Sequence, residues 1–135
     1  MTTAQVVQDN AALVKRGYDA FAAGDMATLQ ALYHVDAAFY TVPQKTDDGS
    51  HLGRDAIFAF FGTIFNESKG TFKAKPMTIA AVDDRVFVLQ EVSGQRNGYS
   101  LKDMGVMVFT IDGGLVREMR EFVTPESHIK AFWDA

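Results

Sequence analysis

The residue best suited to acid–base chemistry in this sequence is Glu121, which lies in the predicted strand 115–123. Alternation along a strand places Glu121 on the same face as Met119 and Val123, but both faces of the segment are similarly apolar. If Glu121 faces an apolar interior, burial raises the pKa of its carboxyl group, which could then exchange protons near neutrality. If it faces outward, it pairs with an arginine or lysine of a neighbouring strand. Periodicity alone leaves both interpretations open.

Four other polar residues could assist a carboxylate. His51 lies in the polar loop before the third predicted helix, where the mouth of a pocket is expected, and histidine titrates near neutrality. Tyr18 and Tyr40 could donate hydrogen bonds to a bound carbonyl or enolate, or could be core residues with a hydroxyl at the rim. Gln90 interrupts an apolar strand; if it points inward it needs a partner, such as a ligand, a tyrosine or Glu121.

Aromatic residues form a second group of candidates. The chain contains 11 phenylalanines and one tryptophan. Phe60, Phe61 and Phe65 recur on one face of a predicted helix, and Trp133 lies near the C-terminus. These side chains either fill the core or line a cavity, and a phenylalanine-lined cavity favours a flat apolar ligand whose polar anchors fix its orientation.

Composition narrows the chemistry further. The chain has no cysteine, which excludes thiolate nucleophiles, disulfides and zinc–thiolate sites. The histidines at 34, 51 and 128 are too scattered for ligand spacing, so no metal site is predicted. Phosphate-loop, nucleophile-elbow and lipidation motifs are also missing from the sequence. We therefore expect no cofactor and, if the protein is an enzyme, cofactor-independent chemistry.

The charge pattern bears on the partners. Thirteen basic and 17 acidic residues give a net charge of −4, whereas binding to nucleic acid requires a clustered basic face. No polybasic patch is present, and no apolar stretch approaches the roughly 20 residues of a spanning helix. The N-terminus carries no apolar signal-peptide core. We expect a cytoplasmic protein without a nucleic-acid or membrane partner.

These candidates must be positioned by a single domain, predicted over residues 1–135. Helical spacing covers residues 3–23, 25–33 and 55–67, with Gly24 ending the first helix and Asp25 capping the second. The strands are predicted at 38–42, 71–82, 85–97, 99–112 and 115–123, followed by a terminal helix at 125–133. Turn signals such as Asn97-Gly98 join the four long strands into an antiparallel meander.

Helices followed by strands indicate an α+β protein with the helices on one face of the sheet. The long strands exceed the usual length, so we expect them to bend into a hollow cone. The outer face of such a sheet would carry Val106, Val108 and Phe122, which predicts a homodimer.

Segments 13–25, 29–38, 53–57 and 112–116 resemble SnoaL-like proteins of the nuclear transport factor 2-like superfamily. The resemblance covers about residues 10–125. It implies a cystatin-like or nuclear transport factor 2-like fold, in which a cone-shaped, curved antiparallel sheet is wrapped by three N-terminal helices. Polyketide cyclases, steroid isomerases, epoxide hydrolases, dehydratases and non-catalytic binding proteins share this scaffold, so the resemblance does not select one activity.

The family's individual chemistries match only in part. Matching to the steroid isomerases places their catalytic positions at Gly17, Thr41 and about Met107, and none of these carries the required residue type. The epoxide hydrolases carry an Arg-Asp-aromatic segment on the last strand, which resembles Arg120-Glu121-Phe122 with a longer acid.

The isomerase match also implies which side chains face inward. On the last strand these are Arg117, Met119 and Glu121, and on the preceding strand Asp103 and Met107. The predicted function is that of a cofactor-independent isomerase, cyclase or hydrolase acting on a small hydrophobic carbonyl compound. The alternative is a non-catalytic ligand-binding or dimerisation module of the same fold.

Overall fold

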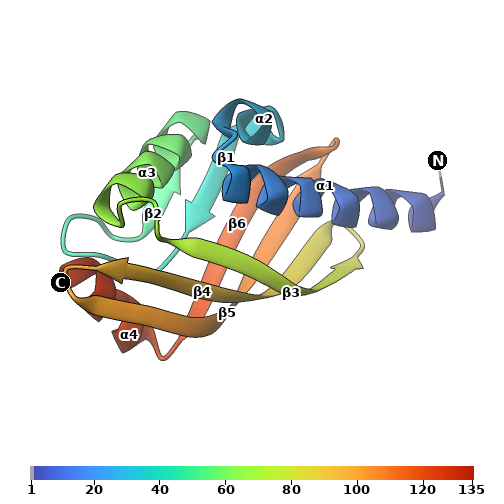
Figure 1. Cartoon of the computed structure of the whole chain (residues 1–135). Coiled ribbons are helices and arrows are strands. Elements are labelled where there is room, and N and C mark those ends of the chain that lie inside the picture. Colours follow the sequence, from blue (N-terminus) through green and yellow to red (C-terminus); the bar gives the residue numbers. More distant parts are fainter. Residues whose placement is uncertain (1) are drawn as a thin grey trace.

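The computed structural model describes residues 2–135 and is shown in Figure 1. In chain order its elements are α1 (Thr3–Ala23), α2 (Met26–Ala31), β1 (Tyr33–Tyr40), β2 (Ser50–Leu52), α3 (Arg54–Glu67), β3 (Lys73–Val82), β4 (Arg85–Arg96), β5 (Tyr99–Asp112), β6 (Leu115–Thr124) and α4 (Glu126–Asp134). The strands form one six-stranded sheet in the order β2-β1-β6-β5-β4-β3. The chain therefore has the predicted α+β architecture, with a curved sheet and helices packed on it.

The first helix ends and the second helix begins at the capping residues predicted from the sequence. The Thr2 hydroxyl accepts a hydrogen bond from the backbone N–H of Gln5 at the start of α1. Gly24 has φ 68° and ends α1 in the left-handed conformation, and Asp25 caps α2 by accepting from the N–H of Thr28. None of the helices between residues 2 and 135 has the length and hydropathy needed to cross a bilayer.

Hairpins join β3, β4, β5 and β6 in succession, which confirms the predicted antiparallel meander. Asn97 and Gly98 have φ values of 47° and 82°, as an Asn-Gly turn requires. By contrast, β1 pairs in parallel with β6, so the sheet is mixed rather than wholly antiparallel. These two strands are distant in sequence, and no local pattern reports which edge of the meander β1 joins.

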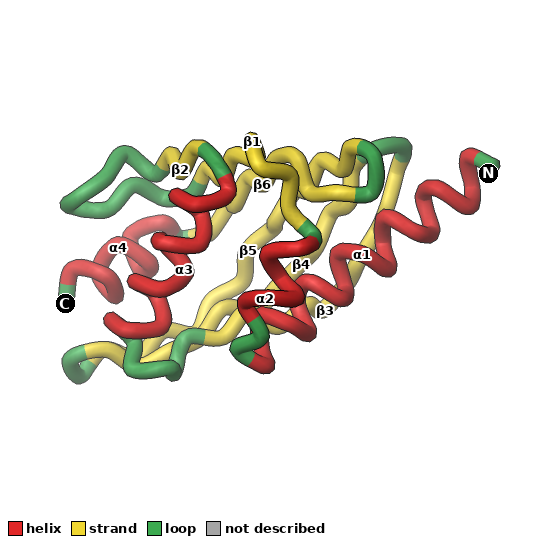
Figure 2. Tube along the Cα trace, turned by 90° about the horizontal axis from the view of Figure 1, so that it is seen from above, coloured by secondary structure: helices red, strands yellow, loops and turns green. Residues whose placement is uncertain are grey.

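Helices α1, α2 and α3 lie on the same face of the sheet, and α4 lies near the β4–β5 hairpin (Figures 1 and 2). The Arg96 guanidinium at the end of β4 donates to the Phe132 carbonyl oxygen of α4 at 3.3 Å. The main core fills the space between α1, α2, α3 and the sheet. A smaller apolar cluster lies beneath α4 and includes Val92, Leu101 and the fully buried Phe132.

The second helix ends earlier than predicted, because Tyr33 is the first residue of β1. The carbonyl oxygen of Leu32 accepts a hydrogen bond from the backbone N–H of Val116 on β6 at 2.8 Å. Pairing with a distant strand has therefore replaced continuation of the helix. His34 follows Tyr33 in β1, with its ring 3.2 Å from the Arg117 guanidinium.

Arg117 faces outward, so the prediction that it points inward is wrong. The register of β5 and β6 shifts at this point: Thr110 lies opposite Glu118, whereas Ile111 lies opposite Val116. One extra residue on β6 is accommodated there, and Val116 is buried while Arg117 is exposed. A bulge of this kind reverses the inward and outward faces, which strict alternation cannot anticipate.

Candidate functional site

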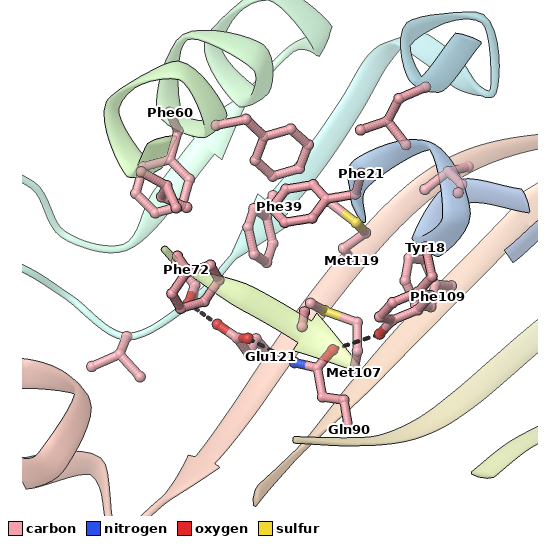
Figure 3. A pocket seen from close by; sticks show the side chains of 18 of the residues that line it. Tyr18, Phe21, Phe39, Phe60, Phe72, Gln90, Met107, Phe109, Met119 and Glu121 are labelled. Atoms are coloured by element: carbon pink, nitrogen blue, oxygen red, sulfur yellow. Dashed lines mark hydrogen bonds between the residues drawn. The ribbon is translucent and has the colours of Figure 1, made fainter. Parts of the chain in front are cut away.

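A cavity of 90 Å³ lies between the helices and the sheet (Figure 3). Most of its wall is apolar and aromatic. The aromatic members are Tyr18, Phe21, Tyr33, Phe39, Phe60, Phe61, Phe72, Phe109 and Trp133. The uncharged polar and charged members are Thr41, Gln44, Gln90, Glu121 and Lys130. An apolar chamber with a few convergent polar groups is the usual form of a small-molecule site.

Four polar side chains form one hydrogen-bonded chain within this wall, as Figure 3 shows in part. The Thr41 hydroxyl donates to Glu121 Oε1 at 2.6 Å, and the Gln90 amide nitrogen donates to Glu121 Oε2 at 2.9 Å. The Tyr18 hydroxyl donates to Gln90 Oε1 at 2.6 Å. Both oxygens of the carboxylate are thus held by uncharged donors, and its orientation is set before any ligand enters.

Three adjacent strands and one helix position this network. Glu121 on β6 lies opposite Met107 on β5, and Gln90 on β4 lies opposite Gly105 on β5. Gln90 must therefore reach across β5 to meet Glu121, and the missing side chain at Gly105 leaves that path open. A Cβ atom at Gly105 would also lie 2.8 Å from the Phe122 carbonyl oxygen, which is too close. The fold thus needs glycine at this point.

Burial dominates the electrostatics of Glu121. Desolvation raises the pKa of its carboxyl group, while the hydrogen bonds from Thr41 and Gln90 partly oppose the rise. No arginine or lysine among residues 2–135 forms an ion pair with it. Glu121 keeps some accessible surface because it lines a hollow, yet protein surrounds it closely enough for desolvation to prevail. Burial, followed by the nearby Glu121, also raises the pKa of Tyr18.

The direction of each hydrogen bond follows from the charge on Glu121. An ionised carboxylate only accepts, so the NH₂ end of the Gln90 amide must face it. The amide oxygen of Gln90 then faces Tyr18, whose single hydroxyl hydrogen is directed at that oxygen. While Glu121 is ionised, Tyr18 therefore has no hydrogen to offer a ligand, which does not fit the donor role, one of the two alternatives that the sequence left open for it.

Most of the predicted site residues lie in the cavity wall. They are Tyr18, Phe60, Phe61, Gln90, Met107, Met119, Glu121 and Trp133. The structure thus brings together residues from α1, α3, α4 and three strands, and their roles toward a ligand remain predictions.

His51 does not line the cavity. Its ring stacks on Phe60, with the ring centroids 3.9 Å apart, and Phe60 separates it from the hollow. Burial lowers the pKa of His51, although the nearby Asp47 and Asp48 act in the opposite direction. Its Nε2 atom is buried and has no hydrogen-bond partner among residues 2–135. The predicted location at the pocket mouth is therefore wrong, and the ring packs against the core instead.

Three other predicted residues also lie away from the cavity. Tyr40 faces outward because its neighbour Thr41 faces inward, and the Arg120 guanidinium lies 4.3 Å from the Tyr40 ring centroid. The Asp103 carboxylate lies 2.9 Å from the Nδ1 atom of His128 and does not line the cavity. Phe65 lies outside the wall, and its ring packs on a residue of α1, Phe21. The predictions that placed Tyr40, Asp103 and Phe65 in the site are thus corrected.

Sequence reasoning missed four polar or charged members of the wall, which are Tyr33, Thr41, Gln44 and Lys130. Thr41 occupies a position that the isomerase match identifies, but a threonine does not satisfy that family's requirement for an acid. The structure gives it a different task, to hold Glu121 in place. Tyr33 also lines the cavity, but the sequence assigns it to the end of a helix. Its true position depends on pairing with β6, for which the local sequence carries no signal.

A protein-family comparison matches residues 14–119 to the SnoaL-like domain. Among solved structures, Bal32a from a soil-derived mobile gene cassette is 37% identical, with a TM-score of 0.90, and the match covers 94% of this chain and 98% of that one. A cystatin-like protein from Xanthomonas campestris is 29% identical, with a TM-score of 0.86 and coverage of 92% and 97%.

An uncharacterized protein of Mycobacterium tuberculosis, Rv0034, is 25% identical over 122 residues, which cover 90% of this chain and 93% of the relative. Solved structures at 18–23% identity, among them proteins proposed to be polyketide cyclases, share the fold alone. The match to the SnoaL-like domain spans both β1 and β5, and ends at Met119, two residues before Glu121.

Proposed function

We propose that this chain, which belongs to the SnoaL-like domain family, is a cofactor-independent enzyme that moves a proton on a small hydrophobic carbonyl compound, with Glu121 as the acid–base group. Solved neighbours proposed to be polyketide cyclases support a scaffold suited to such chemistry. The observation that carries the proposal is the environment of the carboxylate. It is held by uncharged donors in an apolar cavity and has no cationic partner among the described residues.

The environment suits proton abstraction from carbon. The ionised Glu121 carboxylate takes a proton from the carbon next to the carbonyl group, and the C–H electron pair moves onto the carbonyl oxygen to form an enolate. Glu121, now neutral, returns the proton to the same carbon or to another one. Isomerisation follows if the proton returns to a different carbon that is conjugated with the enolate. If instead the enolate carbon attacks a second carbonyl group of the substrate, the π bond of that group breaks, a ring closes, and the resulting alkoxide takes the proton from Glu121.

The raised pKa of Glu121 serves this task. A carboxylate with its ordinary pKa is a weak base, and its proton affinity increases as burial disfavours the charged form. The hydrogen bonds from Thr41 and Gln90 limit this rise in the pKa of Glu121, because they stabilise the ionised form. The rate is therefore expected to rise with pH through the pKa of Glu121, in a range above that of an ordinary carboxyl group.

The cavity limits the substrate. Its 90 Å³ is smaller than the several hundred Å³ of sites for drug-sized ligands. An apolar cavity of about 150 Å³ accepts benzene, so the part of the substrate that this smaller cavity encloses is at most one small ring. The apolar wall favours an uncharged body, and the polar network addresses a single functional group.

Hydrogen–deuterium exchange at the α carbons of cyclopentanone, followed by NMR in D₂O, tests the proposal. This small ketone has the required C–H bonds, and exchange needs no further substrate feature. We expect the protein to accelerate exchange over buffer, and Glu121→Gln to reduce the acceleration by about 100-fold or more. Glu118→Gln, on the outer face of the same strand, is the matched control and should leave the rate unchanged.

Two results would contradict the proposal. If Glu121→Gln exchanges as fast as the wild type, another group is the base. If cyclopentanone binds in the cavity and the wild type does not accelerate exchange, the chain is a non-catalytic binding module for such compounds.

A further inference from the structure

The hydroxyl of Tyr33 is bonded to a poor acceptor inside the cavity. It donates to the thioether sulfur of Met119 at 3.1 Å, and both side chains are buried members of the cavity wall. A thioether is a weak hydrogen-bond acceptor, and a carbonyl oxygen is much stronger. A ligand oxygen arriving beside Met119 would therefore replace the sulfur as the partner of Tyr33.

The other hydroxyl groups of the cavity are committed more firmly. Tyr18 donates to the amide oxygen of Gln90 at 2.6 Å, and Thr41 donates to the carboxylate of Glu121 at 2.6 Å. Redirecting either one would leave a buried amide oxygen or a buried carboxylate short of a hydrogen-bond partner, which is unfavourable. Redirecting Tyr33 gives up only the contact with sulfur.

We propose that Tyr33 donates the hydrogen bond that holds the carbonyl oxygen of the substrate, with the sulfur of Met119 occupying that place until the substrate arrives. The inference rests on the proposed function and deepens it, because it fixes the orientation of a ketone or aldehyde in the cavity. Tyr33 touches the reacting carbonyl group and so acts as a catalytic donor, which stabilises the negative charge that develops on oxygen.

The ring of Tyr33 is held rigidly for this role. Phe58 and Phe61 meet it edge-on, with centroid separations of 5.4 and 6.4 Å and interplanar angles of 84° and 88°. Its backbone is paired with Val116 of β6. Burial raises the pKa of Tyr33, so the phenol stays protonated and remains a donor. A donor on a strand, enclosed by rings, is better ordered than one on a loop.

The donor also lies at a suitable distance from the proposed base. Met119 and Glu121 are two residues apart on the same face of β6, and both line the cavity. Two residues along a strand span about 6–7 Å. A carbonyl oxygen that replaces the sulfur contact would therefore point its α carbon toward the Glu121 carboxylate. Together, the Tyr33 hydroxyl and the Glu121 carboxylate select a neutral ketone or aldehyde with an α C–H bond.

Binding of cyclopentanone and methylenecyclopentane, measured by NMR titration, tests the proposal. The two molecules have almost the same shape, and only the ketone accepts a hydrogen bond. The readout is the ratio of their dissociation constants, because the greater hydrophobicity of the alkene cancels when variants are compared. We expect Tyr33→Phe to weaken ketone binding relative to alkene binding by about 2- to 10-fold. Tyr18→Phe, the matched change in the same cavity, should leave the ratio unchanged.

A spectroscopic measurement separates hydrogen bonding from packing. The carbonyl stretch of [¹³C]carbonyl-labelled cyclopentanone should move to lower frequency in the wild-type protein and return toward its value in an apolar solvent in Tyr33→Phe. Met119→Leu removes the competing sulfur, so the ketone should bind about 2-fold tighter, since the thioether contact is weak.

The same measurements in Glu121→Gln keep the two proposals distinguishable. There the ketone preference and the shifted stretch should persist although exchange is lost. An unchanged ratio and an unchanged stretch in Tyr33→Phe would overturn the role of Tyr33 and leave that of Glu121 untouched. If the preference for the ketone over the alkene is lost in Tyr18→Phe or Gln90→Leu and not in Tyr33→Phe, the donor belongs to the hydrogen-bonded chain that includes Tyr18 and Gln90. Failure of cyclopentanone to bind the wild type would overturn the substrate class.

Discussion

Near the centre of the sheet, the face covered by helices carries polar side chains and the opposite face carries exposed apolar ones. On the helix-covered face, Gln90 is fully buried and Glu121 lines the cavity. On the opposite face, Leu89 is 41% exposed and Phe122 is 60% exposed. Each polar residue and its exposed apolar neighbour are consecutive in sequence, so two strands present their polar side chain inward and their apolar side chain outward. This arrangement opposes the usual preference of folding.

We infer from the reversal that both faces serve purposes other than stability. A buried carboxylate and amide are tolerated only because they bond to each other and to two hydroxyl groups. The exposed apolar residues Phe122, Val106 and Leu89 are register neighbours across β6, β5 and β4 and so form one row. A contiguous apolar row on a sheet face typically marks a contact surface.

Replacing the polar Gln90 on the inner face by an apolar residue should change the stability of the protein more than any other substitution considered below. Gln90→Leu leaves the Tyr18 hydroxyl and one oxygen of Glu121 without their partner, so we expect a loss of about 2–5 kcal/mol in the free energy of unfolding. Leu89→Gln, one residue away on the outer face, should change it by less than about 0.5 kcal/mol. Urea unfolding followed by circular dichroism measures both. Equal effects of the two substitutions would show that the network contributes nothing specific.

A second prediction concerns the exposed apolar row on the outer face, and introducing a charge into this row tests it. We propose that two copies of the chain associate through the row formed by Phe122, Val106 and Leu89. Phe122→Lys then places a cation in the centre of the interface, and the dimer dissociation constant should rise by about 30-fold or more, the loss expected for a central aromatic. Sedimentation velocity at micromolar concentration measures it.

Val82→Lys is the matched control for the dimer. Val82 is 58% exposed but lies at the β3–β4 turn, away from the row, so its substitution should leave association unchanged. A wild-type chain that sediments as a monomer would contradict the dimer.

The smallest expected effect is that of Glu121→Gln on the pH dependence of stability, because glutamine keeps the shape of the glutamate side chain. The pKa of Glu121 is raised in the folded state, so the folded protein is stabilised while the carboxyl is neutral and loses that stability as the pH rises through the raised pKa. At neutral pH the variant should therefore be at least as stable as the wild type. The difference should shrink as the pH falls toward the ordinary value for a glutamate.

Thermal unfolding of both proteins across this pH range measures the difference. A difference that does not vary with pH would mean that Glu121 is not desolvated. Tyr18 and Tyr33, the other groups in this cavity with raised pKa values, stay neutral over the range and do not contribute.

Much of the fold was predictable because its signals are local. The first helix over residues 3–23 and the strand at 99–112 have the predicted bounds, since helix caps, hydrophobic period and Asn-Gly turns act over a few residues. The second helix was overextended to Tyr33, where a hydrogen bond from β6 prevails over helical spacing. The parallel pairing of β1 with β6 had no local signal at all.

The sequence predicted the chemistry of the site better than it predicted which residues line it. Glu121 stands out because it alternates with Met119 and Val123 on one face of its strand, and Gln90 because it is an amide in an otherwise apolar strand. Their bond to each other was one of the alternatives that the sequence left open, and the structure selects it. Thr41 was set aside because it is not an acid, and Tyr40 was chosen although it faces outward.

By itself, the sequence determined which residues alternate and which acid could be buried, because periodicity and side-chain chemistry are properties of neighbouring residues. It did not determine which face of β6 is the inside, since Met119, Glu121 and Val123 are about as apolar as the set that alternates with them. Only the tertiary structure decided this, when three helices packed on one face and enclosed it. Burial is a property of what covers a strand, and the covering elements come from elsewhere in the chain.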